Sequence, residues 1–465
     1  MKSRSSRRAL SLLALMLVVL VAAGCTRTVT GYASHGTGGI KKDAPPSDLE
    51  IVNGDGSAID QLVANSMDDV LAYWDDHFEE VFGTGLDPLA GGIHAYEVDG
   101  DMPIPCFSES DREYAANNAF YCPTEDAIGY DRTFLQGLAD QFGEFIVPLV
   151  MAHEFGHAIQ GRVGAPTNKT ISAEGQADCY AGVFTKATVE GTDHFQSTSA
   201  DLDTVLGGYL MLRDEPGASA DDPGAHGSAF DRVGAFQEGF NEGPEHCYTS
   251  FGPDREYAEI PYITQNDLAN AGNLPYQEML TTIPEEMNKF GSVAAGADWT
   301  AISTDNFDGS NATCAGKGQS ELVFYCESDE TVYAGDEFVQ EAYDKFGDFA
   351  AMTVIALGYG EAIGELADSG QSDAAAFRSR LCLVGAYAGA AFEATVSGEP
   401  SELGDLQLSA GDLDESVMLL IAIGEDDEFI KTHGVDAFER IDTFRQAVHD
   451  AREDSVGTVE DCLSA

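Results

Sequence analysis

The sequence predicts a mainly helical α+β fold that occurs twice along the chain. Three observations support this: an internal repeat with a spacing a little over 200 residues, long apolar segments with the composition of helices, and short β-like runs that precede them. Self-similarity at a fixed spacing is typical of a repeated structural unit. With 465 residues, of which 43% are hydrophobic, the chain is long enough for two or three domains that each bury a core.

The repeat is carried by matched residues in the two halves of the chain. Cys122 matches Cys326, an offset of 204 residues, and Phe236 matches Phe444, an offset of 208, so that small loop insertions explain the drift. Further matches join 140–145 to 344–349 and Tyr180-Ala181-Gly182 to Tyr387-Ala388-Gly389. We therefore expect two copies of one domain in tandem.

Each copy should contain short strands followed by a long buried helix. β-like runs occur at 119–121 and 322–325. Residues 142–163 and 346–367 are rich in Ala, Ile, Leu, Met and Val with interspersed glycines, and we expect them to form matched helices.

The first 25 residues have the pattern of an export signal. Four basic residues precede an apolar run from Ala9 to Ala23, which is too short for a good membrane span. The run ends in Val21-Ala22-Ala23-Gly24-Cys25, which resembles a bacterial lipobox and implies cleavage before Cys25 and lipidation of its thiol. We therefore expect an extracytoplasmic protein of the cell envelope, anchored to the cell membrane through Cys25.

The chain thus divides into four predicted segments. They are a lipoprotein signal peptide at 1–24, the lipidated Cys25 with a flexible tether at 25–60, a first domain at 61–255 and a second domain at 265–465.

The composition is strongly acidic, with 80 acidic and 24 basic residues and a formal net charge of −56. Such a surface repels nucleic acid and anionic lipid headgroups. The acidic residues are spread along the chain, which indicates a solvated folded surface. We therefore expect no nucleic-acid partner, and a membrane contact made by the N-terminal lipid.

Eight cysteines besides Cys25 are divided equally between the two copies. An even number outside the cytoplasm predicts disulfides, and the absence of any CxxC pair disfavours a zinc ribbon. Sequence alone does not fix the connectivity. We predict pairing within each copy, as Cys106–Cys122, Cys179–Cys247, Cys314–Cys326 and Cys382–Cys462.

The first copy contains a metal-binding motif, His153-Glu154-Phe155-Gly156-His157. Residues four apart share one face of a helix, so His153 and His157 can present two imidazole nitrogens to one zinc ion. Glu154 lies beside them, where it can take a proton from a metal-bound water. The apolar residues around the motif predict that the helix is buried.

Two acidic residues complete the pattern on a second predicted helix. Glu174 and Asp178 are again four apart. Glu174 can supply a third zinc ligand, and Asp178 can accept a hydrogen bond from the outer nitrogen of a histidine ligand. Three protein ligands leave the fourth position open, as catalytic zinc requires.

These residues resemble the bacterial neutral zinc metallopeptidases, with a gluzincin-like HExxH…ExxxD arrangement. The resemblance is carried by Phe120-Tyr121-Cys122-Pro123, by His153 to His157, by Glu174 to Gly182, and by the segment from His226-Gly227 to Gly239-Phe240. It implies a zincin-like domain and one zinc ion, held by His153, His157 and Glu174. One departure is Gly175, where family members often carry a larger residue.

The resemblance also implies the reaction, in which zinc-activated water hydrolyses peptide (amide) bonds of a peptide or protein substrate. Glu154 would be the general base, and Asp178 would orient a histidine ligand. The negatively charged oxygen that forms on the attacked carbonyl (the oxyanion) needs a further hydrogen-bond donor. Tyr121 and His226 are the candidates.

The second copy lacks this site. The five site positions align with Leu357, Gly358, Glu361, Leu381 and Gly385. We therefore expect zinc in the first domain only, and a degenerate pseudo-peptidase repeat at 265–465.

The same comparison bears on the two oxyanion candidates. Tyr325 and His433 persist in the copy without a site, which favours a structural role for Tyr121 and His226. Arg232 also has a counterpart and is interpreted as a buried ion-pair anchor.

Two alternatives stay open. One is a non-catalytic binding or scaffold lipoprotein of the cell envelope with structural zinc, although such a site needs no base beside it like Glu154. The other is a zinc amidohydrolase that acts on cell-wall crosslinks, since the site chemistry does not separate these amides from peptides.

Overall fold

The computed structural model describes residues 38–464 except 211–212, 223, 259, 263, 308–313, 315–321, 368–372 and 424–432. The predicted signal peptide at 1–24, the lipidation site Cys25 and the first part of the tether lie outside the described residues. Within the described residues, one helix, Asp348–Leu366, has the length and apolar composition of a membrane span. Because 83% of its apolar window is buried inside the protein, it is the core helix of a globular domain.

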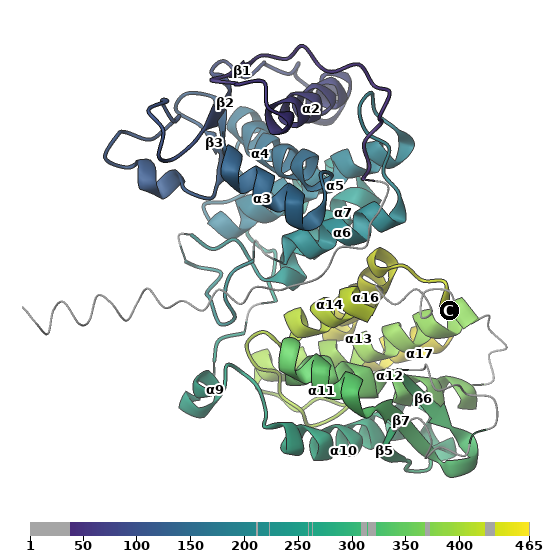
Figure 1. The fold of residues 1–465 in the computed structure, drawn as a ribbon. Helices are drawn as coiled ribbons and strands as arrows, with labels where there is room; N and C mark the ends of the chain where they lie inside the picture. Colours follow the sequence, from purple (N-terminus) through teal and green to yellow (C-terminus); the bar gives the residue numbers. More distant parts are fainter. Residues whose placement is uncertain are drawn as a thin grey trace, which may run out of the picture. The chain divides into compact units, whose positions relative to one another are not determined.

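The first half places a four-stranded sheet against a set of helices (Figure 1). The sheet has the order β1-β2-β4-β3, in which β1, β2 and β4 run parallel and β3 pairs antiparallel with β4 at the edge. Its strands are β1 (Ile51–Val52), β2 (Gly92–Tyr96), β3 (Ala119–Cys122) and β4 (Ala127–Asp131). The helices are α2 (Ala58–Phe82), α3 (Arg132–Phe142), α4 (Ile146–Val163), α5 (Thr170–Glu190), α6 (Ser199–Tyr209), α7 (Ala229–Glu242) and α8 (Pro244–Thr249).

The predicted helix at 142–163 is wrong at its start. Phe142 ends α3, and α4 begins only at Ile146, because Gly143 between them has a φ of 81°, which a right-handed helix excludes. Pro148 lies in the first turn of α4, where its missing N–H is not needed. The helix ends at Val163, as predicted.

The second half repeats this order of elements. Its sheet, β5-β7-β6, has a parallel pair and an antiparallel edge strand, like β2-β4-β3 of the first half. The strands are β5 (Ser303–Phe307), β6 (Val323–Cys326) and β7 (Thr331–Gly335). The helices are α9 (Gln265–Ala269), α10 (Tyr276–Ala294), α11 (Asp336–Lys345), α12 (Asp348–Leu366), α13 (Asp373–Ser397), α14 (Asp412–Ala422), α16 (Ala437–Glu453) and α17 (Ser455–Ser464).

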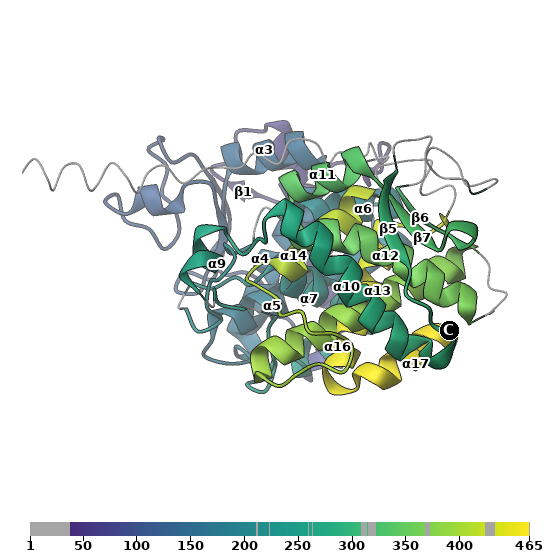
Figure 2. The same ribbon diagram turned by 90° about the horizontal axis from the view of Figure 1, so that it is seen from below.

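The helix α12 is the counterpart of α4 and lies at the centre of the second half. It contacts α10, α11, α13, α14 and the strands β6 and β7, and Figure 2 shows it among these helices. The predicted helix at 346–367 again begins too early, because Gly347, with a φ of 133°, separates α11 from α12. A glycine with positive φ therefore precedes the buried helix in both halves.

Four disulfides are present, and they are the four predicted pairs within the halves. The bridge Cys179–Cys247 ties α5 to α8, and Cys382–Cys462 ties α13 to α17. Each therefore fixes the helix that follows the buried one in its half.

The two halves meet through corresponding helices, with matched hydrogen bonds. The N–H of Phe230 on α7 donates to Asp414 Oδ1 on α14 at 2.9 Å. In the opposite sense, the N–H of Phe438 on α16 donates to Asp203 Oδ1 on α6 at 3.2 Å. In both contacts, the second residue of a helix in one half donates to an aspartate on a helix of the other half.

Candidate metal centre

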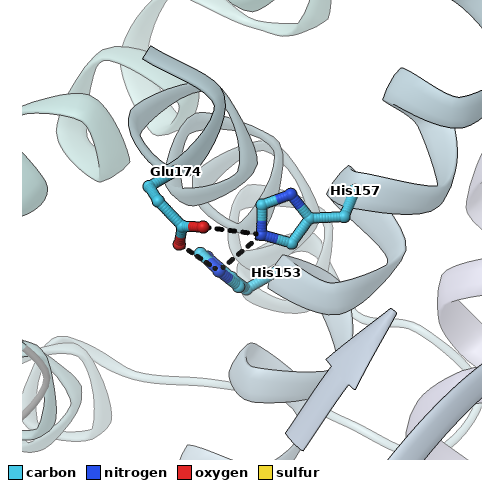
Figure 3. A group of neighbouring side chains, drawn as sticks. All are labelled: His153, His157 and Glu174. Carbon is cyan, nitrogen blue, oxygen red and sulfur yellow. Dashed lines mark hydrogen bonds and ion pairs between the residues drawn. The ribbon is translucent and has the colours of Figure 1, made fainter. Parts of the chain in front are cut away.

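Three side chains from α4 and α5 converge on one point. His153 and His157 lie one turn apart on α4, and Glu174 faces them from the first half of α5 (Figure 3). His153 Nε2 lies 3.2 Å from His157 Nε2 and 3.3 Å from Glu174 Oε2. His157 Nε2 lies 3.5 Å from Glu174 Oε1. The sequence predicted these three residues as one ligand set, and the structure brings them together.

These separations fit a zinc ion. A tetrahedral site with zinc–ligand bonds of about 2.05 Å has donor atoms about 3.3 Å apart. The separations of 3.2, 3.3 and 3.5 Å lie close to that value, with each histidine nearest to a different oxygen of the Glu174 carboxylate. Two imidazole nitrogens and one carboxylate also form a typical catalytic zinc set, with a fourth position left open.

The outer nitrogen of each histidine has an acceptor. His153 Nδ1 lies 2.7 Å from Asp178 Oδ1, which is the contact that the sequence predicted for Asp178. His157 Nδ1 lies 3.0 Å from Gln160 Oε1, and the amide of Gln160 in turn donates to the Ala173 carbonyl at 2.7 Å. A proton on each Nδ1 leaves both Nε2 atoms free as metal ligands. Sequence reasoning missed Gln160, whose only signal was its place one helical turn after His157.

Asp178 is itself held from α7. Arg232 Nε donates to Asp178 Oδ2 and Arg232 Nη2 to Asp178 Oδ1, each at 2.8 Å, and both side chains are buried. This is the buried ion pair that was predicted for Arg232. A two-point contact of this kind fixes the plane of the carboxylate, and so the orientation of the His153 ring.

The local electrostatics favour a positive charge at this point. Burial alone would lower the pKa of His153, but Asp178 and Glu174 raise it to about 10. Burial would raise the pKa of Glu174, but the two histidines hold it well below its usual range. Because the acidic groups stabilise protons on both imidazoles, the same field would stabilise a bound cation.

Glu154 lies on the buried side of the motif, with 6% of its surface exposed. Burial raises the pKa of its carboxyl, and the two histidines act against this shift. The backbone of Tyr121 on β3 also lowers the pKa of this carboxyl, and β3 packs against α4, so the edge strand lies close to the base candidate.

A cavity of about 570 Å³ opens beside the three ligands. Its polar lining includes His153, Glu154, His157, Glu174, His226 and Arg232. Its apolar lining includes Phe134, Ile146, Leu149 and Val150, and residues 119–121 of the edge strand β3 also line it. The site can therefore admit a polypeptide segment next to the metal position.

The two oxyanion candidates differ in their surroundings. The hydroxyl of Tyr121 donates to Asp126 at 2.8 Å, and Asp126 also pairs with Arg162, so this hydroxyl takes part in a structural network. The His226 side chain is 52% exposed, lies 3.4 Å from Asp214 through Nδ1, and lines the cavity. The geometry leaves His226 as the better donor candidate.

The glycine at position 175, where related proteins often carry a larger residue, is explained by its close neighbour. A Cβ at this position would lie 3.0 Å from the ring of Phe251. A larger residue would press on this buried ring.

The corresponding place in the second half is filled. A Cβ on Gly358, which aligns with Glu154, would lie 2.5 Å from Val332 and 2.7 Å from Val323, so the strands pack directly on α12. Glu361, which aligns with His157, accepts from the N–H of Tyr325 at 2.9 Å and pairs with Arg380 at 3.3 Å.

Comparison with known proteins points the same way. Residues 106–251 match the family model described as "Putative neutral zinc metallopeptidase". The chain is 30% identical over 163 residues to Uncharacterized protein Rv2575 of Mycobacterium tuberculosis. This match covers 29% of this chain and 56% of that protein. It is 28% identical over 154 residues to Uncharacterized protein YpfJ of Escherichia coli K12. This second match covers 28% of this chain and 53% of that protein. The chain thus spans about half the length of the curated relatives it matches. No solved structure matches.

Proposed function

We propose, from the match of residues 106–251 to the zinc metallopeptidase family, that this protein is a zinc-dependent peptidase. The observation that carries the proposal is the convergence of His153 Nε2, His157 Nε2 and the Glu174 carboxylate, with contacts of 3.2 to 3.5 Å, beside the buried Glu154. A structural zinc site needs neither an adjacent carboxylate nor a cavity at its open side.

Each residue has one role in this proposal. His153, His157 and Glu174 hold the ion, and Asp178 with Arg232 orients the His153 ring. When bound, zinc supplies a Lewis acid that polarises a carbonyl group and makes water a better nucleophile. Glu154 takes the proton of the attacking water and passes it to the leaving amine. His226, at the cavity wall, donates to the oxygen on which negative charge develops.

The shape of the cavity favours an extended peptide as substrate. Residues 119–121, which line the cavity, belong to the edge strand β3, and a peptide can align with such an edge in extended form. The apolar lining of Phe134, Ile146, Leu149 and Val150 suits an apolar side chain of the substrate next to the cleaved bond.

The second half acts in this proposal as a degenerate copy without zinc. The matched strand order and the matched disulfides support the duplication, and the packing of Val323 and Val332 on α12 supports the loss of the site. We expect one zinc ion per chain, in the first half.

The proposed location is the outer side of the cell membrane. It rests on the lipobox-like segment that ends in Cys25, and the four disulfides suit an oxidising compartment. Labelling of growing cells with palmitate should mark the parent protein and leave a Cys25→Ser variant unlabelled. Equal labelling of the two would contradict the anchor.

The activity is tested with a library of quenched fluorescent peptides and, in parallel, with purified peptidoglycan. The zinc-loaded parent should cleave peptides, and Glu154→Gln should retain zinc but lose at least about 100-fold in kcat/KM. Glu144→Gln, an exposed carboxylate before α4, serves as the control and should retain parental activity. Cleavage of peptidoglycan alone would favour the amidohydrolase, and no cleavage of either substrate would favour a binding protein.

A further inference from the structure

A cluster of three buried carboxylates in the second half has no role in the proposed reaction. One oxygen from each of Asp348, Asp412 and Glu415 lies within 4.8 Å of the others. The three residues are 4%, 5% and 5% exposed. They come from different parts of the chain, since Asp348 begins α12, whereas Asp412 and Glu415 lie in the first turn of α14.

Two oxygens of this cluster lack a protein partner. Asp348 Oδ2 accepts from the N–H of Leu274 at 3.0 Å, and Asp412 Oδ2 accepts from the N–H of Ser409 at 2.7 Å. Among the described residues, Asp348 Oδ1 and Asp412 Oδ1 have no hydrogen-bond donor, although both atoms are buried. A buried polar atom without a partner is costly and points to a bound group.

The charge of the cluster is also unbalanced. In the part of the chain that the structure describes, none of the three carboxylates forms an ion pair with Lys, Arg or His. The N-termini of α12 and α14 contribute about +0.5 each. With all three ionised, the carboxylates would leave a net charge of about −2, which one divalent cation would neutralise. Without a cation, burial and the neighbouring carboxylates raise the pKa of all three groups.

The structure assigns to this cluster a calcium ion, held by Asp348, Asp412 and Glu415. Carboxylate oxygens alone suit Ca²⁺ or Mg²⁺ better than zinc or copper, which favour nitrogen and sulfur. Mg²⁺ keeps several waters, for which side chains at most 5% exposed leave little room, whereas Ca²⁺ exchanges its waters for protein oxygens in irregular geometry.

The backbone around the three carboxylates leaves room for them and donates hydrogen bonds to them. A Cβ on Gly347 would lie 1.9 Å from Glu415 Oε1, so only glycine leaves room for the carboxylate. The loop 270–274, which follows α9, is held close to Asp348 by two hydrogen bonds. The Leu274 N–H donates to Asp348 Oδ2, and the Asp348 N–H donates to Asn273 Oδ1 at 2.7 Å. The ion would thus join α12, α14 and this loop, and stabilise the half that carries no zinc.

The first half offers a natural comparison. Glu144 occupies the position that corresponds to Asp348, but its side chain is exposed and belongs to no such cluster among the described residues. We therefore expect one calcium site per chain, independent of the zinc site.

Calcium binding to the zinc-loaded full chain is measured by calorimetry and by terbium luminescence, in 0.3 M NaCl to screen the acidic surface. The parent should bind one Ca²⁺ per chain, and calcium at 100 times Kd should raise Tm by about 5 °C. Asp412→Asn and Glu415→Gln should lose this rise and retain zinc. Glu144→Gln should behave like the parent.

Two results would overturn the assignment. One is a parent chain that binds no calcium beyond weak, salt-sensitive association. The other is an Asp412→Asn variant that binds calcium as tightly as the parent. If Asp412→Asn does not fold, the titration of the parent still shows whether the protein binds calcium. Asp348→Asn then takes the place of Asp412→Asn as the variant that should lose calcium binding.

Discussion

His153 and Asp178 are joined by a contact of 2.7 Å between Nδ1 and Oδ1. The same carboxylate carries both hydrogen bonds from Arg232. Three helices, α4, α5 and α7, therefore meet at a single buried carboxylate. The ring that would ligate the metal is oriented by a residue that is itself fixed from a third helix.

Replacing Asp178 with Asn should weaken zinc binding about 10- to 100-fold. The amide retains an acceptor for His153 but removes the negative charge that pairs with the buried Arg232, so the free energy of unfolding should also fall by about 3–5 kcal/mol. Zinc affinity is measured by competition with a chelating dye, and stability by thermal unfolding. Asp140→Asn, on the exposed face of α3, is the control. Parental zinc affinity in Asp178→Asn would contradict the role of this contact.

The crossing of α5 over α7 should not tolerate a methyl group. A Cβ on Gly182 would lie 2.0 Å from the carbonyl oxygen of Phe236, so Gly182→Ala should lower the free energy of unfolding by about 1–3 kcal/mol. Gly137 on α3 has no atom within 4 Å of its added Cβ, and Gly137→Ala should instead stabilise by about 0.5–1 kcal/mol. Urea unfolding of both variants checks the difference, and equal effects would refute it.

Removing the bridge Cys179–Cys247 should cost about 2–5 kcal/mol of unfolding free energy. The bridge joins residues 68 apart, whereas Cys106–Cys122 joins residues 16 apart. Because closing a longer loop restricts the unfolded chain more, the Cys179→Ala/Cys247→Ala variant should lose more than Cys106→Ala/Cys122→Ala. Chemical denaturation of the two double variants makes the comparison. The reverse order would show that native contacts outweigh loop length.

The stability of the first half should depend on pH through Glu238. Its carboxylate accepts two hydrogen bonds from Arg255, at 2.9 and 2.8 Å, and lies 3.0 Å from His246. Burial would raise the pKa of Glu238, but His246 and Arg255 hold it well below the usual value of 4.5.

A carboxyl whose pKa is lower in the folded state stabilises the fold above its unfolded pKa, and this contribution is lost as the pH falls through the folded value. Glu238→Gln should therefore be less stable than the parent at pH 7, and the difference should shrink below pH 4.5. Thermal unfolding from pH 7 to pH 3 measures this. A difference that stays constant with pH would contradict the assignment.

The candidate site was largely predictable because its residues follow helical spacing. His153 and His157 are four apart, as are Glu174 and Asp178, and this periodicity places each pair on one helix face. The start of α4 was not predictable from composition, because the break depends on the backbone angle at Gly143.

Contacts between segments far apart in the chain also could not be predicted from the sequence. The carboxylates of Asp348 and Glu415 meet only because α12 and α14 pack together, and no local spacing signals this. The central strand β2 was missed for a related reason, since its place is set by pairing with β1 and β4. Its five residues, Gly92–Tyr96, have no strong strand pattern of their own.

The most direct test of the metal centre is the zinc content of the purified protein, measured beside His153→Ala and Glu154→Gln. The parent should hold one zinc ion per chain, His153→Ala should lose it, and Glu154→Gln should keep it, because Glu154 is a base and not a ligand. A parent that holds no zinc after loading would contradict the proposed peptidase. Two zinc ions per chain would contradict the proposal that only the first half binds the metal.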